Sequence, residues 1–198
     1  MPSRGDRNAD IIRAVIHLLE SEGYDAVQVR RVADEASISL ATLYKLYGSR
    51  DELIIRAIEQ WMAENVYAGL DDVPTNGTPY EAATRIVRRV FARWERQPHM
   101  LAAFTLARLR PGGQRLDAQG YNAVLPRAHA TLASLDPELL ADITVILEHV
   151  NLAALQRFAA GEIAVDEIVP LYELALRRLL PDDPAVSAAA NKSRRLRR

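Results

Sequence analysis

Apolar residues recur at intervals of three and four along most of the chain, which is the spacing of one face of an α-helix. Ile11, Val15 and Leu18 show this spacing near the start, and Gly23 ends that first segment. Apolar and polar residues nowhere alternate over a useful strand length. The pattern therefore predicts an all-α protein.

Short helical segments follow the first one. VRRVADEA (29–36) and LATLYKLY (40–47) are separated only by the tripeptide SIS, which is the layout of a helix-turn-helix. Ser49 precedes a helix expected over about residues 50–67, and Glu52 three residues later completes the sequence pattern of a capping box.

The helices change character after a linker at 69–80 that contains Gly, Pro, Asn and Asp. Beyond it they become longer and richer in Ala and Leu. Asp136 before Pro137 predicts a capped helix start, whereas Pro170 predicts that the last helix starts or bends near that residue. The expected helices cover roughly residues 79–96, 98–110, 113–134, 137–160 and 166–180.

These segments predict three parts of the chain. A helix-turn-helix domain with three short helices is expected at 1–55, and a larger helical domain at 56–182. A basic tail at 183–198 lacks a core pattern, so we expect it to be disordered and interpret it as solvated rather than as a DNA arm.

Composition limits the classes of function. The net charge of -1 means that a surface for nucleic acid must be local. Residues 28–50 carry four basic and two acidic side chains, net +2, whereas residues 1–66 carry eight basic and eleven acidic ones, net -3. The chain has no cysteine, which fits a reducing cytoplasm and excludes thiolate metal sites. Apolar runs stay well short of the roughly 18 residues that span a membrane, so we expect a cytoplasmic protein.

The sequence VRRVADEASISLATLYKLYGSRDEL (29–53) resembles the DNA-binding segment of the TetR family of bacterial transcriptional regulators. The family pattern has a valine, a basic residue, an Ile/Val-Ala pair, an alanine, a turn, Thr-Leu-Tyr, an aromatic residue and a basic-Glu-Leu cap. This chain supplies, in that order, Val29, Arg31, Val32-Ala33, Ala36, Ile38-Ser39, Thr42-Leu43-Tyr44, Tyr47 and Arg50-Asp51-Glu52-Leu53. Within the family, GYDAVQVRRVADEA and TLYKLY look closest to the actinobacterial repressors of sterol and cholesterol catabolism.

The resemblance implies that the third helix enters the major groove of DNA with its N-terminal residues on the base edges. Hydroxyl side chains can hydrogen-bond there, small apolar ones can meet thymine methyl groups, and cationic or phenolic groups can bind phosphates. The candidate DNA-binding residues are, by these groups, Ser39 and Thr42; Leu40 and Ala41; and Arg30, Tyr44, Lys45 and Arg50.

The chain also departs from the family pattern. Ser37 stands where glycine is usual, so it must adopt the turn conformation with a Cβ atom. Leu40 and Ala41 replace common Lys or Gly and cannot hydrogen-bond to bases, so we expect recognition through thymine methyls and DNA shape. The alternative interpretation makes Tyr44 a half-buried core residue and Arg30 a solvated charge.

For the larger domain, the resemblance implies effector binding and dimerisation. Broad apolar stripes along 137–160 and 166–180 predict a homodimer through residues 137–180, although both stripes could pack on their own domain. Polar and aromatic residues in apolar surroundings are the candidate ligand contacts, with structural roles as the alternative for each. They are Trp94, Phe104, Arg108, Tyr121, His149 and Asn151. The surroundings favour an apolar effector of the steroid or acyl-CoA type.

The alternatives are a small all-α enzyme and a helical interaction module without DNA binding. Phosphate-binding loops and the G-x-S-x-G motif are absent, and the four histidines lack metal-ligand spacing. We therefore predict no catalytic residues, no metal and no cofactor. The prediction is a regulator, most often a repressor in this family, that binds a palindromic double-stranded DNA operator and responds to a small molecule. The sequence leaves repression and activation both open.

Overall fold

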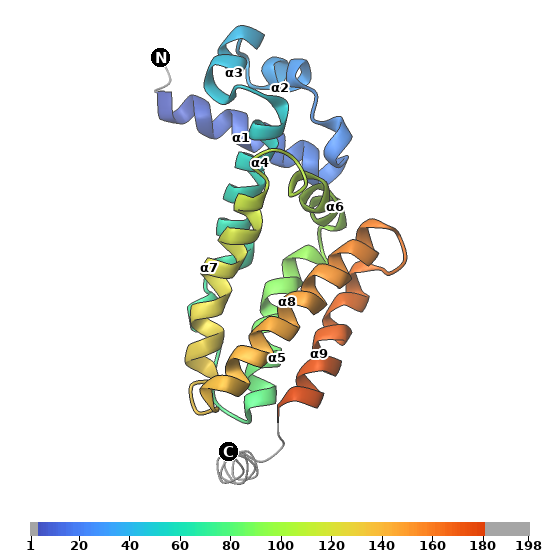
Figure 1. Cartoon of the computed structure of the whole chain (residues 1–198). Coiled ribbons are helices and arrows are strands. Elements are labelled where there is room, and N and C mark those ends of the chain that lie inside the picture. The colour runs from blue at the N-terminus through green and yellow to red at the C-terminus, as the bar shows by residue number, and fades with distance from the viewer. Residues whose placement is uncertain (1–3, 181–198) are drawn as a thin grey trace, which may run out of the picture. The chain divides into compact units, whose positions relative to one another are not determined.

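The computed structural model describes residues 4–180, and helices are the only regular secondary structure over that range (Figure 1). This confirms the all-α prediction. The elements are α1 (Arg4–Ser21), η1 (Tyr24–Ala26), α2 (Val29–Glu35), α3 (Leu40–Tyr47), α4 (Arg50–Trp61), η2 (Met62–Tyr67), η3 (Leu70–Asp72), α5 (Pro79–Trp94), α6 (Pro98–Ala107), α7 (Gln114–Thr131), α8 (Pro137–Ala159), η4 (Val165–Glu167) and α9 (Ile168–Leu179). Within this range, none of the helices combines the length and apolarity that crossing a membrane would require.

The described residues form two compact units. The first unit comprises residues 4–68 and 93–121, and the second comprises residues 69–92 and 122–180. The sequence-based division after residue 55 falls within α4 and stays a prediction. The tail predicted at 183–198 lies outside the described residues.

The first unit has a core between α1, α4 and α6. Aromatic side chains form its centre: the ring centroids of Trp61 and Trp94 lie 4.7 Å apart, and those of Trp94 and Phe104 lie 5.4 Å apart. The Nε1 of Trp61 donates a hydrogen bond of 2.8 Å to the Glu20 carboxylate, which satisfies the indole donor inside the core. Beyond Trp61, the helix continues in the wider π geometry of η2, so the helix predicted to reach residue 67 changes hydrogen-bonding pattern near its end.

The helix predicted from Ser49 begins as expected, because the Ser49 Oγ accepts a hydrogen bond of 3.1 Å from the Glu52 N–H. The reciprocal half of the predicted capping box is wrong. The Ser49 N–H donates to the Tyr47 carbonyl, and the Glu52 carboxylate binds Arg56 and Arg115 instead. The sequence pattern could not show this, because Arg115 is far away in the chain.

In the second unit, α8 and α9 run side by side (Figure 1). The Asp136 carboxylate caps α8 by accepting a hydrogen bond of 2.9 Å from the Glu138 N–H, as predicted. Pro170 lies in the first turn of α9, so the last helix starts near the proline rather than bending at it. The unit is held by a hydrophobic cluster whose members include Ala83, Ile143 and Leu176 from α5, α8 and α9.

Candidate nucleic-acid interface

α2 and α3 form the predicted helix-turn-helix. Val32 and Ala33 of α2 and Leu43 of α3 are buried, so the apolar faces of the two helices are used inside the first unit. Ser37 in the turn has a φ of 52°, a left-handed conformation that favours glycine. The serine therefore adopts the turn conformation for which the family pattern usually has glycine.

The other face of α3 is open to solvent. Tyr44 is 47% exposed, so about half of its surface is open to solvent, and the alternative of a half-buried tyrosine stays open. Ala41 and Lys45 are exposed beside it, and Leu40 is half-buried. The face therefore combines a phenol, an ammonium group and small apolar groups, which suits a phosphate backbone next to methyl-bearing bases.

The two hydroxyl groups at the start of α3 are already paired. The Ser39 Oγ accepts a hydrogen bond from the Thr42 N–H and lies 2.8 Å from the Thr42 Oγ1. This arrangement caps the helix, so polar base contacts from these residues would have to share or replace it. The side chains that remain available for base contacts at the start of α3 are consequently the apolar ones of Leu40 and Ala41.

Two neighbouring arginines of α2 have different roles. Arg30 is exposed and forms no ion pair with the rest of the described chain, so its charge is available. Arg31 binds the Glu22 carboxylate through both Nη atoms, at 2.8 and 2.5 Å, and also binds Glu35. The hydrogen bond to Glu22 raises the pKa of Arg31 above its ordinary value, and the same bond lowers the pKa of Glu22.

Arg50 serves a structural role that the sequence did not reveal. Its Nε and Nη2 donate to the carbonyl oxygens of Val27 and Tyr24, both at 2.6 Å, and its guanidinium carbon lies 4.6 Å from the centre of the Tyr24 ring. The Tyr24 hydroxyl donates to Asp51, and burial together with this carboxylate raises the pKa of Tyr24. Arg50 thus fastens the start of α4 to η1, while its predicted phosphate contact stays a prediction.

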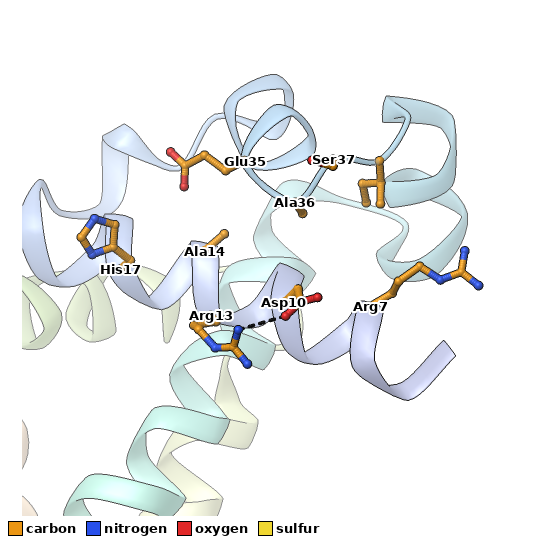
Figure 2. A pocket seen from close by; sticks show the side chains of 9 residues that line it. Arg7, Asp10, Arg13, Ala14, His17, Glu35, Ala36 and Ser37 are labelled. Carbon is orange, nitrogen blue, oxygen red and sulfur yellow. Dashed lines mark hydrogen bonds and ion pairs between the residues drawn. The ribbon is translucent and has the colours of Figure 1, made fainter. Parts of the chain in front are cut away.

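A groove runs between α1 and the turn that joins α2 to α3 (Figure 2). Its lining residues are Arg7, Asp10, Arg13, Ala14, His17, Glu35, Ala36, Ser37 and Ile38. Figure 2 shows the ion pair of 2.9 Å between Arg13 and Asp10 in its wall. The wall mixes acidic and basic groups, so the groove lacks the uniform positive charge that a phosphate track needs.

The predicted ligand residues divide between the units. Trp94, Phe104, Arg108 and Tyr121 belong to the first unit, and His149 and Asn151 to the second. Most of these side chains have partners within their own unit.

Trp94 and Phe104 are core residues of the aromatic cluster, and Arg108 binds Asp117. The Asn151 Oδ1 accepts a hydrogen bond of 2.7 Å from the Tyr172 hydroxyl. Ligand binding by the six residues stays a prediction. Among the described residues, His, Asp and Glu side chains nowhere gather in a group of three that could hold a metal ion.

The second unit carries an exposed apolar face on α8 and α9. Val145 and Leu152 of α8 are 53% and 41% exposed, and Leu174 of α9 is 57% exposed. Val145 and Leu152 are seven residues apart, two turns along one side of the helix. Apolar groups exposed in such a row are typical of a surface that binds another protein surface.

Comparison with known proteins places these features in context. A family model described as "Bacterial regulatory proteins, tetR family" matches residues 11–57, and one described as "Tetracyclin repressor-like, C-terminal domain" matches residues 77–179. The HTH-type transcriptional repressor KstR of Mycolicibacterium smegmatis is 30% identical over 103 residues, which are 52% of this chain and 50% of that repressor. The chain thus spans about half the length of the curated relatives it matches. These matches confirm the resemblance that the sequence predicted.

Solved structures share the fold. FadR from Bacillus subtilis, in complex with stearoyl-CoA, has a TM-score of 0.62 and 14% identity, covering 88% of this chain and 98% of that chain. A cysteine mutant of the TetR family regulator CifR, in a structure with 26-base-pair operator DNA, has a TM-score of 0.58 and 16% identity, covering 89% and 98%. At these identities the likeness extends to the fold alone.

Proposed function

Because the chain belongs to the TetR family of bacterial regulatory proteins, we propose that it is a transcriptional repressor that binds a palindromic DNA operator as a homodimer and responds to a small effector. The observation that carries this proposal is the solvent-exposed face of α3, with Tyr44 and Lys45 on a helix whose other side is buried. Supporting it, KstR is named a repressor, and the similar CifR structure contains operator DNA.

α3 would lie in the major groove, with Leu40 and Ala41 at the base edges. Tyr44 and Lys45 on its exposed side, and Arg30 of α2, would contact phosphates, which orient the protein without specifying sequence. Ser39 and Thr42 would add polar contacts only where DNA draws their hydroxyls from the helix cap.

The exposed apolar face of α8 and α9 would form the homodimer. Val145, Leu152 and Leu174 would meet their symmetry mates, so that two helices from each copy make a four-helix bundle. A two-fold dimer presents two copies of α3 and therefore requires a palindromic operator.

We propose an effector that is largely apolar, of the acyl-CoA or steroid type. The similar FadR structure holds stearoyl-CoA, which is the chemistry that motivates this class. Such a ligand releases DNA only if it binds the DNA-free conformation more tightly, and the change in DNA affinity is limited to that difference. A protein that regulates a bacterial chromosome would act in the cytoplasm.

Selection of DNA from a random duplex pool by the purified chain tests this proposal. A regulator enriches a two-fold symmetric sequence, and titration with stearoyl-CoA then reports whether this ligand weakens the complex. Failure to enrich any sequence at low salt would remove DNA recognition and leave the helical interaction module as the better interpretation. The sequence contains no motif that favours the alternative of a small enzyme.

A further inference from the structure

The chain turns sharply between α6 and α7, over residues 108–117, a segment called the corner below. A Cβ atom on Gly113 would lie 2.2 Å from the Ala107 carbonyl oxygen, so only glycine allows this close return of the chain. Across the turn, the Nε and Nη2 of Arg108 donate hydrogen bonds of 3.1 and 3.0 Å to the Asp117 carboxylate. The backbone contact and the ion pair together fix the shape of the corner.

One side chain of the corner reaches α4 at two points. The Nη1 of Arg115 donates to Glu52 at 3.0 Å, and its Nε donates to Glu59 at 2.9 Å. Glu52 and Glu59 are seven residues apart, so the guanidinium spans two turns on one side of α4. A single arginine therefore holds α4 along most of its length.

The charges of this bridge are mutually dependent. Burial opposes ionisation of Glu52, yet the hydrogen bonds from Arg115 and Arg56 outweigh it and keep the pKa of that carboxyl below its ordinary value. The hydrogen bonds to Glu52 and Glu59 in turn raise the pKa of Arg115. Without Arg115, two partly buried carboxylates would share one side of α4 with Arg56 alone.

The corner also touches the start of the helix-turn-helix. The guanidinium carbon of Arg110 lies 6.0 Å from the centre of the Tyr24 ring, which Arg50 contacts at 4.6 Å. α4 itself follows α3 after only Gly48 and Ser49. A displacement of the corner would therefore move α4, and α4 would in turn move α3.

We propose that the corner clamps α4 in the position that lets α3 bind DNA, and that Arg115 is the positioning residue of this clamp. The proposal rests on the proposed function, because it concerns how the DNA-binding helix is oriented. All of its contacts lie within the first unit. Arg115 itself touches no DNA and acts only through Glu52 and Glu59.

A matched pair of variants tests the clamp. Arg115→Gln removes the bridge between the corner and α4. Arg56→Gln is the control, because Arg56 binds the same Glu52 carboxylate at 2.9 Å but belongs to α4 and cannot link it to the corner. A third variant, Arg115→Lys, keeps the charge but loses the fork that reaches both carboxylates, and it serves if Arg115→Gln fails to fold.

Two measurements separate positioning from general stability. The chain has no cysteine, so Asp34→Cys, at an exposed position of α2, gives one spin label per copy. The distance between the two labels then reports on the separation of the two helix-turn-helix motifs in the proposed dimer. Affinity for the selected operator is measured on the same variants without the label. We expect Arg115→Gln to broaden the distance distribution and weaken operator binding about tenfold, with Arg56→Gln close to wild type.

Testing Arg115→Gln in a background that lacks both carboxylates adds a readout that a merely structural role would not give. With Glu52→Gln and Glu59→Gln already present, Arg115→Gln should cause little further loss, because its partners are gone. Equal behaviour of Arg115→Gln and Arg56→Gln in both measurements would overturn the clamp.

Failure of the clamp and failure of the proposed function give different results. If the wild-type chain is monomeric, the labels show no dipolar signal. If it selects no DNA, there is no operator on which affinity can be measured. In either case the proposed function fails, and amide hydrogen exchange in residues 50–61 still decides the clamp. Exchange there should be faster in Arg115→Gln than in Arg56→Gln, and equal exchange would refute it.

Discussion

The exposed face of α3 and the exposed face of α8 and α9 both lie on helices, but their side chains differ in chemistry. On α3, Tyr44 lies beside a lysine on a helix of 8 residues. On α8, a helix of 23 residues, Val145 and Leu152 lie two turns apart, and their exposed fractions are similar to that of Tyr44. A surface with cationic and phenolic groups suits a polyanion, whereas a row of branched apolar groups suits another apolar surface.

The two faces also depend on different contacts. A helix as short as α3 is unstable alone, so it needs the Ser39 cap, the buried Leu43 and the contacts of Arg50 near its end. α8 has enough length to be ordered largely by its own periodic core contacts. The difference teaches that the exposed face of α3 depends on a cap and on a few contacts from outside a short helix, whereas that of α8 and α9 lies on long helices whose periodic apolar positions pack on each other and on α5.

The largest effect is expected at the proposed dimer face, which is the exposed apolar face of α8 and α9. Leu152→Glu places a charge within the proposed interface and should weaken dimerisation at least about a hundredfold. Leu109→Glu is the control, because Leu109 is 79% exposed but belongs to the first unit. Analytical ultracentrifugation should show a monomer only for Leu152→Glu at micromolar concentration. A wild-type monomer under these conditions would remove the assignment of residues 137–180.

On α3, the first test concerns Tyr44. Tyr44→Ala should weaken binding about tenfold on specific and non-specific DNA alike, because a phosphate contact carries no base information. Tyr44→Phe keeps the ring and isolates the hydroxyl. Unchanged affinity in a gel-shift titration of the alanine variant would mean that this exposed side chain faces solvent in the complex.

A smaller effect tests the apolar tip of α3. Replacing thymine by uracil at each contacted operator position removes one methyl group and should weaken binding about fourfold, since burying such a group is worth ~0.8 kcal/mol. The Leu40→Ala variant should respond less to the same replacement. Equal binding of thymine and uracil operators would show that Leu40 and Ala41 do not contact base methyls.

The smallest effect is a change of salt dependence. Lys45→Ala should lower the slope of log affinity against log salt by about 0.9 per half-site, because one phosphate contact is lost. Arg31→Ala provides the contrast, since Arg31 is held by Glu22 and Glu35 and should leave the slope unchanged. A slope that Lys45→Ala does not alter would take Lys45 off the list of phosphate contacts.

Local features of the fold could be predicted from the sequence. The helix starts at Ser49 and Asp136 follow from short-range chemistry, and the unusual turn at Ser37 follows from the family pattern. The structure confirms all three. Helical periodicity likewise gave the segments of the second unit, because core positions repeat along each helix.

Contacts between distant segments could not be predicted. The sequence placed Arg50 at a phosphate and paired Glu52 with a backbone amide, because nothing local identifies Val27 or Arg115 as partners. The sequence likewise did not show that Trp94 and Phe104 pack in one aromatic cluster; their role in ligand binding stays a prediction. A long side chain can reach many positions, and only the fold selects one.

The aromatic cluster of the first unit gives the protein a built-in optical probe. Trp61 and Trp94 are the only tryptophans of the chain, and both belong to the first unit. Indole emission therefore reports on that unit alone, whereas far-ultraviolet circular dichroism reports on the helices of both. If the two signals change at different urea concentrations, the units unfold in separate steps; if the curves coincide, they unfold together. Unlabelled protein suffices for this measurement.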